Sequence, residues 1–210
     1  MSRMTAMTAM PRKSRALRLA SFLASTAAAL SLSACISFGP EPPESLLTLT
    51  SEAVAPVGDG AAITSDNAIA IYEPFAPARL DVTRVPVQID DSSIAYVPEA
   101  IWVEKPARLF RRVLAETIRA EGVRAVMDED DTGLAATTIL RGSLVDFGYD
   151  VPTGSVVVRY DAILTNGENT PRRRRFESIV PGVAPEANPV GVALNRAAND
   201  VARQVADWAR

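Results

Sequence analysis

The residue types that carry most catalytic chemistry are scarce in this chain of 210 residues, which contains no histidine and one cysteine, Cys35. Without histidine, the chain cannot form a Ser-His-Asp triad or a Cys-His pair, and it offers no imidazole to zinc or haem. A single cysteine also excludes an internal disulfide and a thiolate cluster. The sequence therefore argues against most enzyme designs, and the position of Cys35 becomes the main chemical question.

Carboxylates are the remaining candidates for catalysis or metal binding. Asp146, Asp150 and Asp161 could serve a paired-carboxylate hydrolase, but they are spread over predicted strands without neighbours that would separate their pKa values. The acidic residues 128–131 have the initial spacing of a calcium loop, yet Ile139 stands at the twelfth position, where a bidentate carboxylate is needed. We expect no enzymatic activity, no metal and no cofactor, and a hydrolase stays an alternative.

Cys35 lies at the end of an N-terminal segment with the pattern of an export signal. Four basic residues, Arg12, Lys13, Arg15 and Arg18, precede an apolar run over residues 19–32. The run is shorter than the roughly 20 residues that a membrane-spanning helix needs. Leu32-Ser33-Ala34-Cys35 has the Leu-small-small-Cys order of a bacterial lipobox. The sequence predicts a signal peptide over residues 1–34, cleaved between Ala34 and Cys35. The alternative is that Cys35 is the end of an ordinary signal peptide or a small core residue.

A processed Cys35 would carry diacylglycerol on its sulfur and a fatty acid, such as palmitate, on its amino group. Several acyl chains hold a protein firmly on a bilayer, since each buried methylene contributes about 0.8 kcal/mol. Ile36 rather than aspartate follows the cysteine, which favours the periplasmic face of the outer membrane over the inner membrane. Removal of residues 1–34 leaves 17 basic against 25 acidic residues, a net charge of −8 that argues against a nucleic-acid partner.

Behind the cysteine, the composition predicts a flexible tether over residues 35–44 and a domain over residues 45–210. Pro106 and Gly122 have the positions of a helix start and a helix end, and Asn188 and Pro189 open a second helix that reaches Trp208. Apolar alternation predicts strands over residues 46–50, 68–72, 85–89, 93–97, 123–127, 137–149, 155–165 and 172–180. The expected fold is α+β, with two layers: a mostly antiparallel sheet and two long helices packed on one face.

Three stretches resemble one known family. They are Leu80-Asp81 to Arg84-Val85, Ile94-Ala95-Tyr96, and residues 101–106 around Trp102, which lead into the first helix. The chain resembles the ABC-type transport auxiliary lipoprotein family over most of residues 45–208. The resemblance implies a non-catalytic lipoprotein that works with an MCE-domain periplasmic protein and an ABC transporter to move lipids between the inner and outer membranes. A structural or assembly lipoprotein of another envelope complex is the alternative.

Two groups of residues are candidate contacts with a partner or with lipid. Arg172, Arg173, Arg174 and Arg175 lie in a predicted strand, where alternate side chains point to opposite faces. They fit either an acidic partner or anionic headgroups, or a solvated edge whose charges prevent sheet-to-sheet aggregation. The aromatic residues Tyr96 and Trp102 fit either a lipid-accepting groove or an ordinary core.

Overall fold

The computed structural model describes residues 45–58, 62–127, 134–167 and 169–210. Residues 43–210 form one compact unit. Ala34, Cys35 and the acidic residues 128–131 lie outside the described residues, and so does the predicted tether. Among the residues that are described, no helix is long and apolar enough to cross a bilayer.

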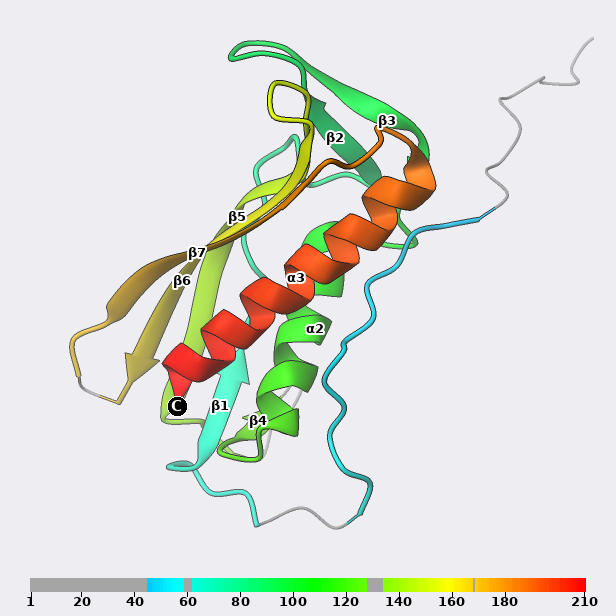
Figure 1. Cartoon of the computed structure of the whole chain (residues 1–210). Coiled ribbons are helices and arrows are strands. Elements are labelled where there is room, and N and C mark those ends of the chain that lie inside the picture. The colour runs from blue at the N-terminus through cyan, green and yellow to red at the C-terminus, as the bar shows by residue number, and fades with distance from the viewer. Residues whose placement is uncertain (1–44, 59–61, 128–133, 168) are drawn as a thin grey trace, which may run out of the picture. The chain divides into compact units, whose positions relative to one another are not determined.

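Two helices cover one face of a seven-stranded mixed sheet (Figure 1). The strands are β1 (Ala68–Ile71), β2 (Arg84–Gln88), β3 (Ile94–Ile101), β4 (Ala125–Met127), β5 (Thr138–Asp150), β6 (Ser155–Asn166) and β7 (Arg172–Pro181). The helices are α2 (Pro106–Ala120) and α3 (Ala187–Ala209). The predicted two-layer α+β fold is confirmed.

The long strand β5 organises the sheet. On one side it pairs over its whole length with β6, which pairs in turn with β7, and both pairings are antiparallel. On the other side, β1 lies parallel to its first half and β2 lies parallel to its end. The remaining strands complete this side, since β4 runs parallel to β1 and β3 runs antiparallel to β2.

The core lies between the sheet and the helices. In β6, Val156, Val158 and Tyr160 are fully buried, as the alternation of the sequence predicts. Four aromatic rings form a continuous series of edge-to-face contacts, with centroids 5.8 Å apart for Trp102 and Phe147, 6.2 Å for Phe147 and Phe110, and 5.3 Å for Phe110 and Tyr160. Such pairs stabilise a core beyond the area that they bury.

The predicted start of the second helix, with Asn188 as its cap and Pro189 as its first residue, is wrong by two residues. Helix α3 begins at Ala187, with Glu186 in an extended conformation before it, and no side chain caps its first turn. Asn188 is therefore the second residue of the helix and not its cap. Pro189 still fits, because the N–H groups of a first helical turn have no partner within the helix.

The predicted strand at residues 46–50 is not a strand in the structure. It is the first part of an extended segment, residues 46–55, that crosses the two helices and that we call the strap. It forms one isolated bridge, between Leu47 and Trp102. Side chains of the helices then bind its backbone: the Thr50 and Glu52 amides donate to the Asn195 and Asn199 side chains at 2.8 Å, and the Ala55 amide donates to Glu116 at 2.9 Å. The backbone of Leu47 bonds to Ile101 and Val103, but after Leu47 the helix side chains take the hydrogen bonds that a neighbouring strand would supply. The segment therefore does not extend the sheet beyond this bridge.

Candidate functional site

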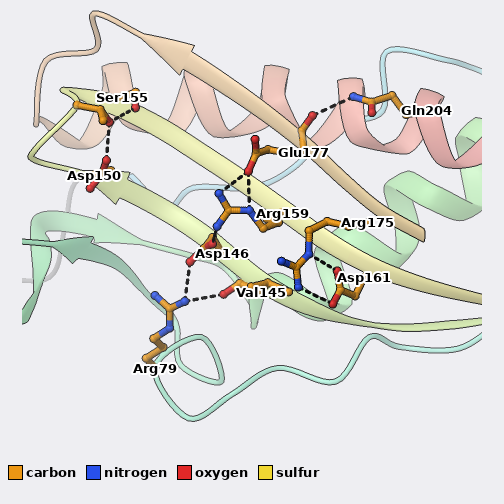
Figure 2. Close-up of polar contacts among 11 residues, drawn as sticks. Arg79, Val145, Asp146, Asp150, Ser155, Arg159, Asp161, Arg175, Glu177 and Gln204 are labelled. Carbon is orange, nitrogen blue, oxygen red and sulfur yellow. Dashed lines mark hydrogen bonds and ion pairs between the residues drawn. The ribbon is translucent and has the colours of Figure 1, made fainter. Parts of the chain in front are cut away.

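Polar side chains of β5, β6 and β7 contact one another on the face of the sheet that neither α2 nor α3 covers (Figure 2). In β6 and β7, the residues that alternate with the core positions point to this face. They include Arg159 and Asp161 in β6, and Arg173, Arg175 and Glu177 in β7. We call it the helix-free face.

A chain of ion pairs crosses the middle of the helix-free face. Arg79 lies 2.6 Å from the Asp146 carboxylate and also donates to the Val145 carbonyl at 2.5 Å. Arg159 contacts both Asp146 and Glu177. These side chains are between 23% and 38% exposed, so the chain of charges binds the loop before β2 to β5, β6 and β7 across a partly solvated surface.

A hollow of about 350 Å³ adjoins these ion pairs. It lies where β2 meets β5, and Gly148 forms part of its floor. A Cβ atom at Gly148 would lie 2.3 Å from the carbonyl oxygen of Pro86, so only glycine allows this close approach of the two strands. The two arginines that line the hollow, Arg79 and Arg159, already have carboxylate partners, and Asp91 and Asp150 line it as well. The hollow is therefore poorly suited to an anionic ligand.

A second cluster of charges lies nearer the start of β7. The Asp161 carboxylate accepts from Arg175 at 2.6 and 2.8 Å, and from Arg173 at 3.3 Å. The hydrogen bond from Arg175 is the main reason why the pKa of Asp161 is lowered, and it outweighs the opposite effect of burial. The carboxylate is therefore ionised at neutral pH and acts as an acceptor for arginine, not as a proton donor.

The structure separates the four arginines as strand alternation predicts. Arg173 and Arg175 lie on the helix-free face, whereas Arg172 and Arg174 lie on the helix side. The Arg172 guanidinium stacks 5.0 Å from the Trp208 ring, and that of Arg174 lies 5.0 Å from the Phe176 ring. The four residues therefore form two pairs with different surroundings.

The two aromatic candidates lie in different environments. Trp102 is 1% exposed and packs within the core, so in this structure its ring offers no surface to lipid or to a partner. Its burial agrees with the core interpretation. Tyr96 is half-buried opposite Pro86, with the Arg84 guanidinium 3.8 Å from its ring centroid.

The carboxylates considered for catalysis are not brought together as an acid and a base. Asp146 and Asp161 are each held by arginines, and Asp150 accepts from Thr153 at the turn after β5. Within the described ranges, no group of three or more carboxylate or cysteine side chains has the geometry of a metal site. The arrangement is that of ion pairs that bind strands together.

A family model for the ABC-type transport auxiliary lipoprotein component matches residues 47–206 of the chain. The chain belongs to this family. As an auxiliary lipoprotein, it is a component of an ABC-type transport system, and its location is the cell envelope. The match covers all seven strands, the whole of α2, and α3 as far as Ala206. It begins at Leu47 in the strap, after the signal and tether residues.

Solved structures share the fold of this auxiliary lipoprotein. Protein XCC0632 from Xanthomonas campestris is 14% identical with a TM-score of 0.65, and the alignment covers 78% of this chain and 94% of that one. A second crystal structure, of an uncharacterized protein, is 15% identical with a TM-score of 0.57, covering 79% and 98%. At these identities the likeness is one of fold. None of the curated proteins compared with the chain is a significant match.

The ion pairs of the helix-free face were not predicted. Asp146 and Asp161 stand in the sequence without any marker of their arginine partners, which lie 67 residues away for Arg79 and 14 for Arg175. The alternation within β6 and β7 is the one available signal, since it places Arg159, Asp161, Arg173 and Arg175 on one face.

Proposed function

We propose that this protein is a lipid-anchored, non-enzymatic auxiliary component of an ABC transport system that contains an MCE-domain protein and moves lipids between the inner and outer membranes. The observation that carries the proposal is the family match over residues 47–206. The lipobox at residues 32–35 supports it independently, because it lies 12 residues before the match begins. On this proposal, Cys35 carries the acyl chains and the domain lies at the periplasmic face of the outer membrane.

The strap supports a positional role for the anchor. It leads from the N-terminal side directly onto the helices, where three backbone amides are bound by Asn195, Asn199 and Glu116. Asn199 is 2% exposed and also donates to the Thr50 carbonyl at 2.9 Å. On this proposal, the acyl anchor is connected to the domain through a segment that is hydrogen-bonded to both helices.

The anchor is tested by mass spectrometry of the mature N-terminal peptide. The expected result is a diacylglyceryl thioether and an N-acyl group on Cys35, with the protein in the membrane fraction. Cys35→Ala should accumulate as unprocessed precursor, whereas Ser37→Ala, which keeps the lipobox intact, should behave as the unmodified protein does. An unmodified thiol at Cys35, or a mature protein released freely into the periplasm, would contradict the anchor.

The transport role is tested by purifying the tagged, lipidated protein from membranes. Recovery of an MCE-domain subunit together with an ABC ATPase, and a loss of lipid movement between membranes when the protein is deleted, are the expected results. Recovery of subunits from an envelope complex that has no ATPase would favour the alternative of a structural or assembly lipoprotein.

A further inference from the structure

The half of the helix-free face near the start of β7 combines exposed aromatic residues with arginines. Strand register places Arg141, Ile163 and Arg173 side by side across β5, β6 and β7. The next row contains Ser143, Asp161 and Arg175, and Phe75 joins it through a bridge to Ser143. Tyr72 completes the group, since the Arg141 guanidinium lies 4.3 Å from its ring centroid. We call these six residues the basic-aromatic surface: Tyr72, Phe75, Arg141, Ile163, Arg173 and Arg175.

The apolar members of the basic-aromatic surface are unusually exposed. Phe75 is 69% exposed, and Tyr72 and Ile163 are each 37% exposed. A large ring that is left in water, beside a second ring and an aliphatic side chain, contributes nothing to the core that the opposite face of the sheet forms. Aromatic residues and arginine are also the residue types that are enriched at the centre of protein interfaces.

The charge of this surface is opposite to that of the whole chain. Its three arginines lie around one directly bound carboxylate, Asp161, with Asp146 and Glu177 near Arg175, while the chain carries a net charge of −3 and the portion after residue 34 carries −8. The side chains of Arg173 and Arg175 remain 69% and 58% exposed although they bind Asp161. Since a guanidinium has five N–H donors, both retain donors for a further acceptor. A partner that presents carboxylates around an apolar side chain is complementary to this surface.

The position of the strap decides between a protein partner and the anchoring bilayer. Leu47, the first paired residue of the strap, lies against Gly191 of α3, so the chain reaches the domain on its helix side. The nine residues between Cys35 and Ser45 reach about 30 Å when fully extended. The described part of the chain thus begins on the helix layer, whereas the basic-aromatic surface lies on the opposite face of the sheet, which favours a protein partner over the anchoring bilayer.

We propose that the basic-aromatic surface is the docking surface for an acidic face of the transport system's periplasmic subunit, with Phe75 as its apolar centre. This inference rests on the proposed function, which supplies the partner. It adds the face of the domain that the partner contacts and the chemistry of the partner's surface.

Site-specific photocrosslinking in the intact envelope tests the proposal. The full, lipidated protein carries p-benzoylphenylalanine at position 75, or at position 192 as the control, because Val192 is 66% exposed on α3 at the opposite layer. The expected result is an adduct between position 75 and an MCE-domain or permease subunit, absent at position 192. Adding Arg141→Glu should reduce this adduct at least fivefold, while Arg196→Glu, an equal charge change on an exposed part of α3, should leave it unchanged.

The other outcomes separate the surface from the function. Transporter adducts at position 192 but not at position 75 would overturn the docking surface and leave the proposed function standing. Adducts of position 75 with phospholipid, or with a second copy of this chain, would also overturn it, in favour of a bilayer or a self-associating face. No transporter adduct at either position, together with no co-purification of transporter subunits, would overturn both.

Discussion

The contact between the strap and α3 leads to a prediction about Gly191→Ala. Its effect on the free energy of unfolding should change sign when Leu47 is replaced by alanine. Gly191 lies in the interior of α3, and a Cβ atom there would lie 2.6 Å from Cδ2 of Leu47. Gly191→Ala therefore has two opposed effects. Alanine favours the helix over glycine by about 0.5–1 kcal/mol, whereas forcing an extra methyl into a packed contact costs about 1–3 kcal/mol.

In the otherwise unchanged protein, the crowding should exceed the gain in helix propensity. We expect Gly191→Ala to lower the free energy of unfolding by about 1 kcal/mol, because Leu47 must move away from its packed position. In a Leu47→Ala background the obstacle is gone, and only the propensity remains. There, Gly191→Ala should raise the free energy of unfolding by about 0.5–1 kcal/mol. The coupling between the two positions is then about 1.5–2 kcal/mol.

The measurement is a double-mutant cycle by urea denaturation of the unlipidated chain from residue 36 onward, followed by circular dichroism. Gly182→Ala is not a suitable control, because its positive φ of 70° would add strain of its own. Val192→Ala, an exposed neighbour on the same helix, serves instead and should show no coupling with Leu47→Ala. If Gly191→Ala has the same effect in both backgrounds within about 0.5 kcal/mol, the strap does not pack against α3 as described.

Two further predictions concern ionisable groups of the long strands. Arg175 lowers the native pKa of Asp161, so the stabilising contribution of this carboxylate is present above the ordinary aspartate pKa of about 4 and is lost as the pH falls through the lowered value. The difference in unfolding free energy between the protein and Asp161→Asn should therefore shrink below about pH 4 in an acid denaturation series. A constant difference would contradict the ion pair. The Tyr160 hydroxyl is buried without a hydrogen-bond partner in the described part of the chain, and burial raises its pKa. Tyr160→Phe should leave the free energy of unfolding unchanged or raise it. Tyr149→Phe removes a 2.9 Å hydrogen bond to the Val183 carbonyl and should lower the free energy of unfolding by about 1 kcal/mol. Equal losses for the two variants in urea denaturation would refute this difference between the two hydroxyl groups.

The local elements follow from local patterns, and the sequence predicted them for that reason. The helix from Pro106 and the strands β5, β6 and β7 lie within one or two residues of their expected bounds. These elements have strong hydrophobic periodicity and clear turn signals between them, both of which act over a few residues. The strap was predicted as a strand because Leu47 and Leu49 alternate with polar residues, and that pattern does not reveal that the hydrogen bonds come from helix side chains.

The parallel strand pairings could not be predicted from the sequence and are seen only in the folded chain. β1 lies between β4 and β5, and β2 lies beside the end of β5, although each partner is at least 50 residues away in sequence. Such pairings depend on which apolar faces bury each other once the helices pack, and no local signal encodes them. The pattern of predicted strands and helices indicated the α+β class, and the segments around Arg84 and Trp102 indicated the family, but neither predicted this order of strands.

The ion pairs show most clearly what tertiary structure decided. Strict alternation along β5 from Leu140 and Leu144 places Asp146 in the core, but the register shifts between Leu144 and Asp146 and turns this carboxylate to the helix-free face. There it meets Arg79 and Arg159. The sequence by itself determined that the arginines of β7 divide between two faces, and it predicts that Cys35 ends a lipobox. Only the tertiary structure decided the ion-pair partners. The bulge in β5 sets the partners of Asp146, and the register of β6 and β7 sets the partners of Asp161. A side-chain period of two loses its phase at one inserted residue, so the sequence pattern alone cannot place these groups.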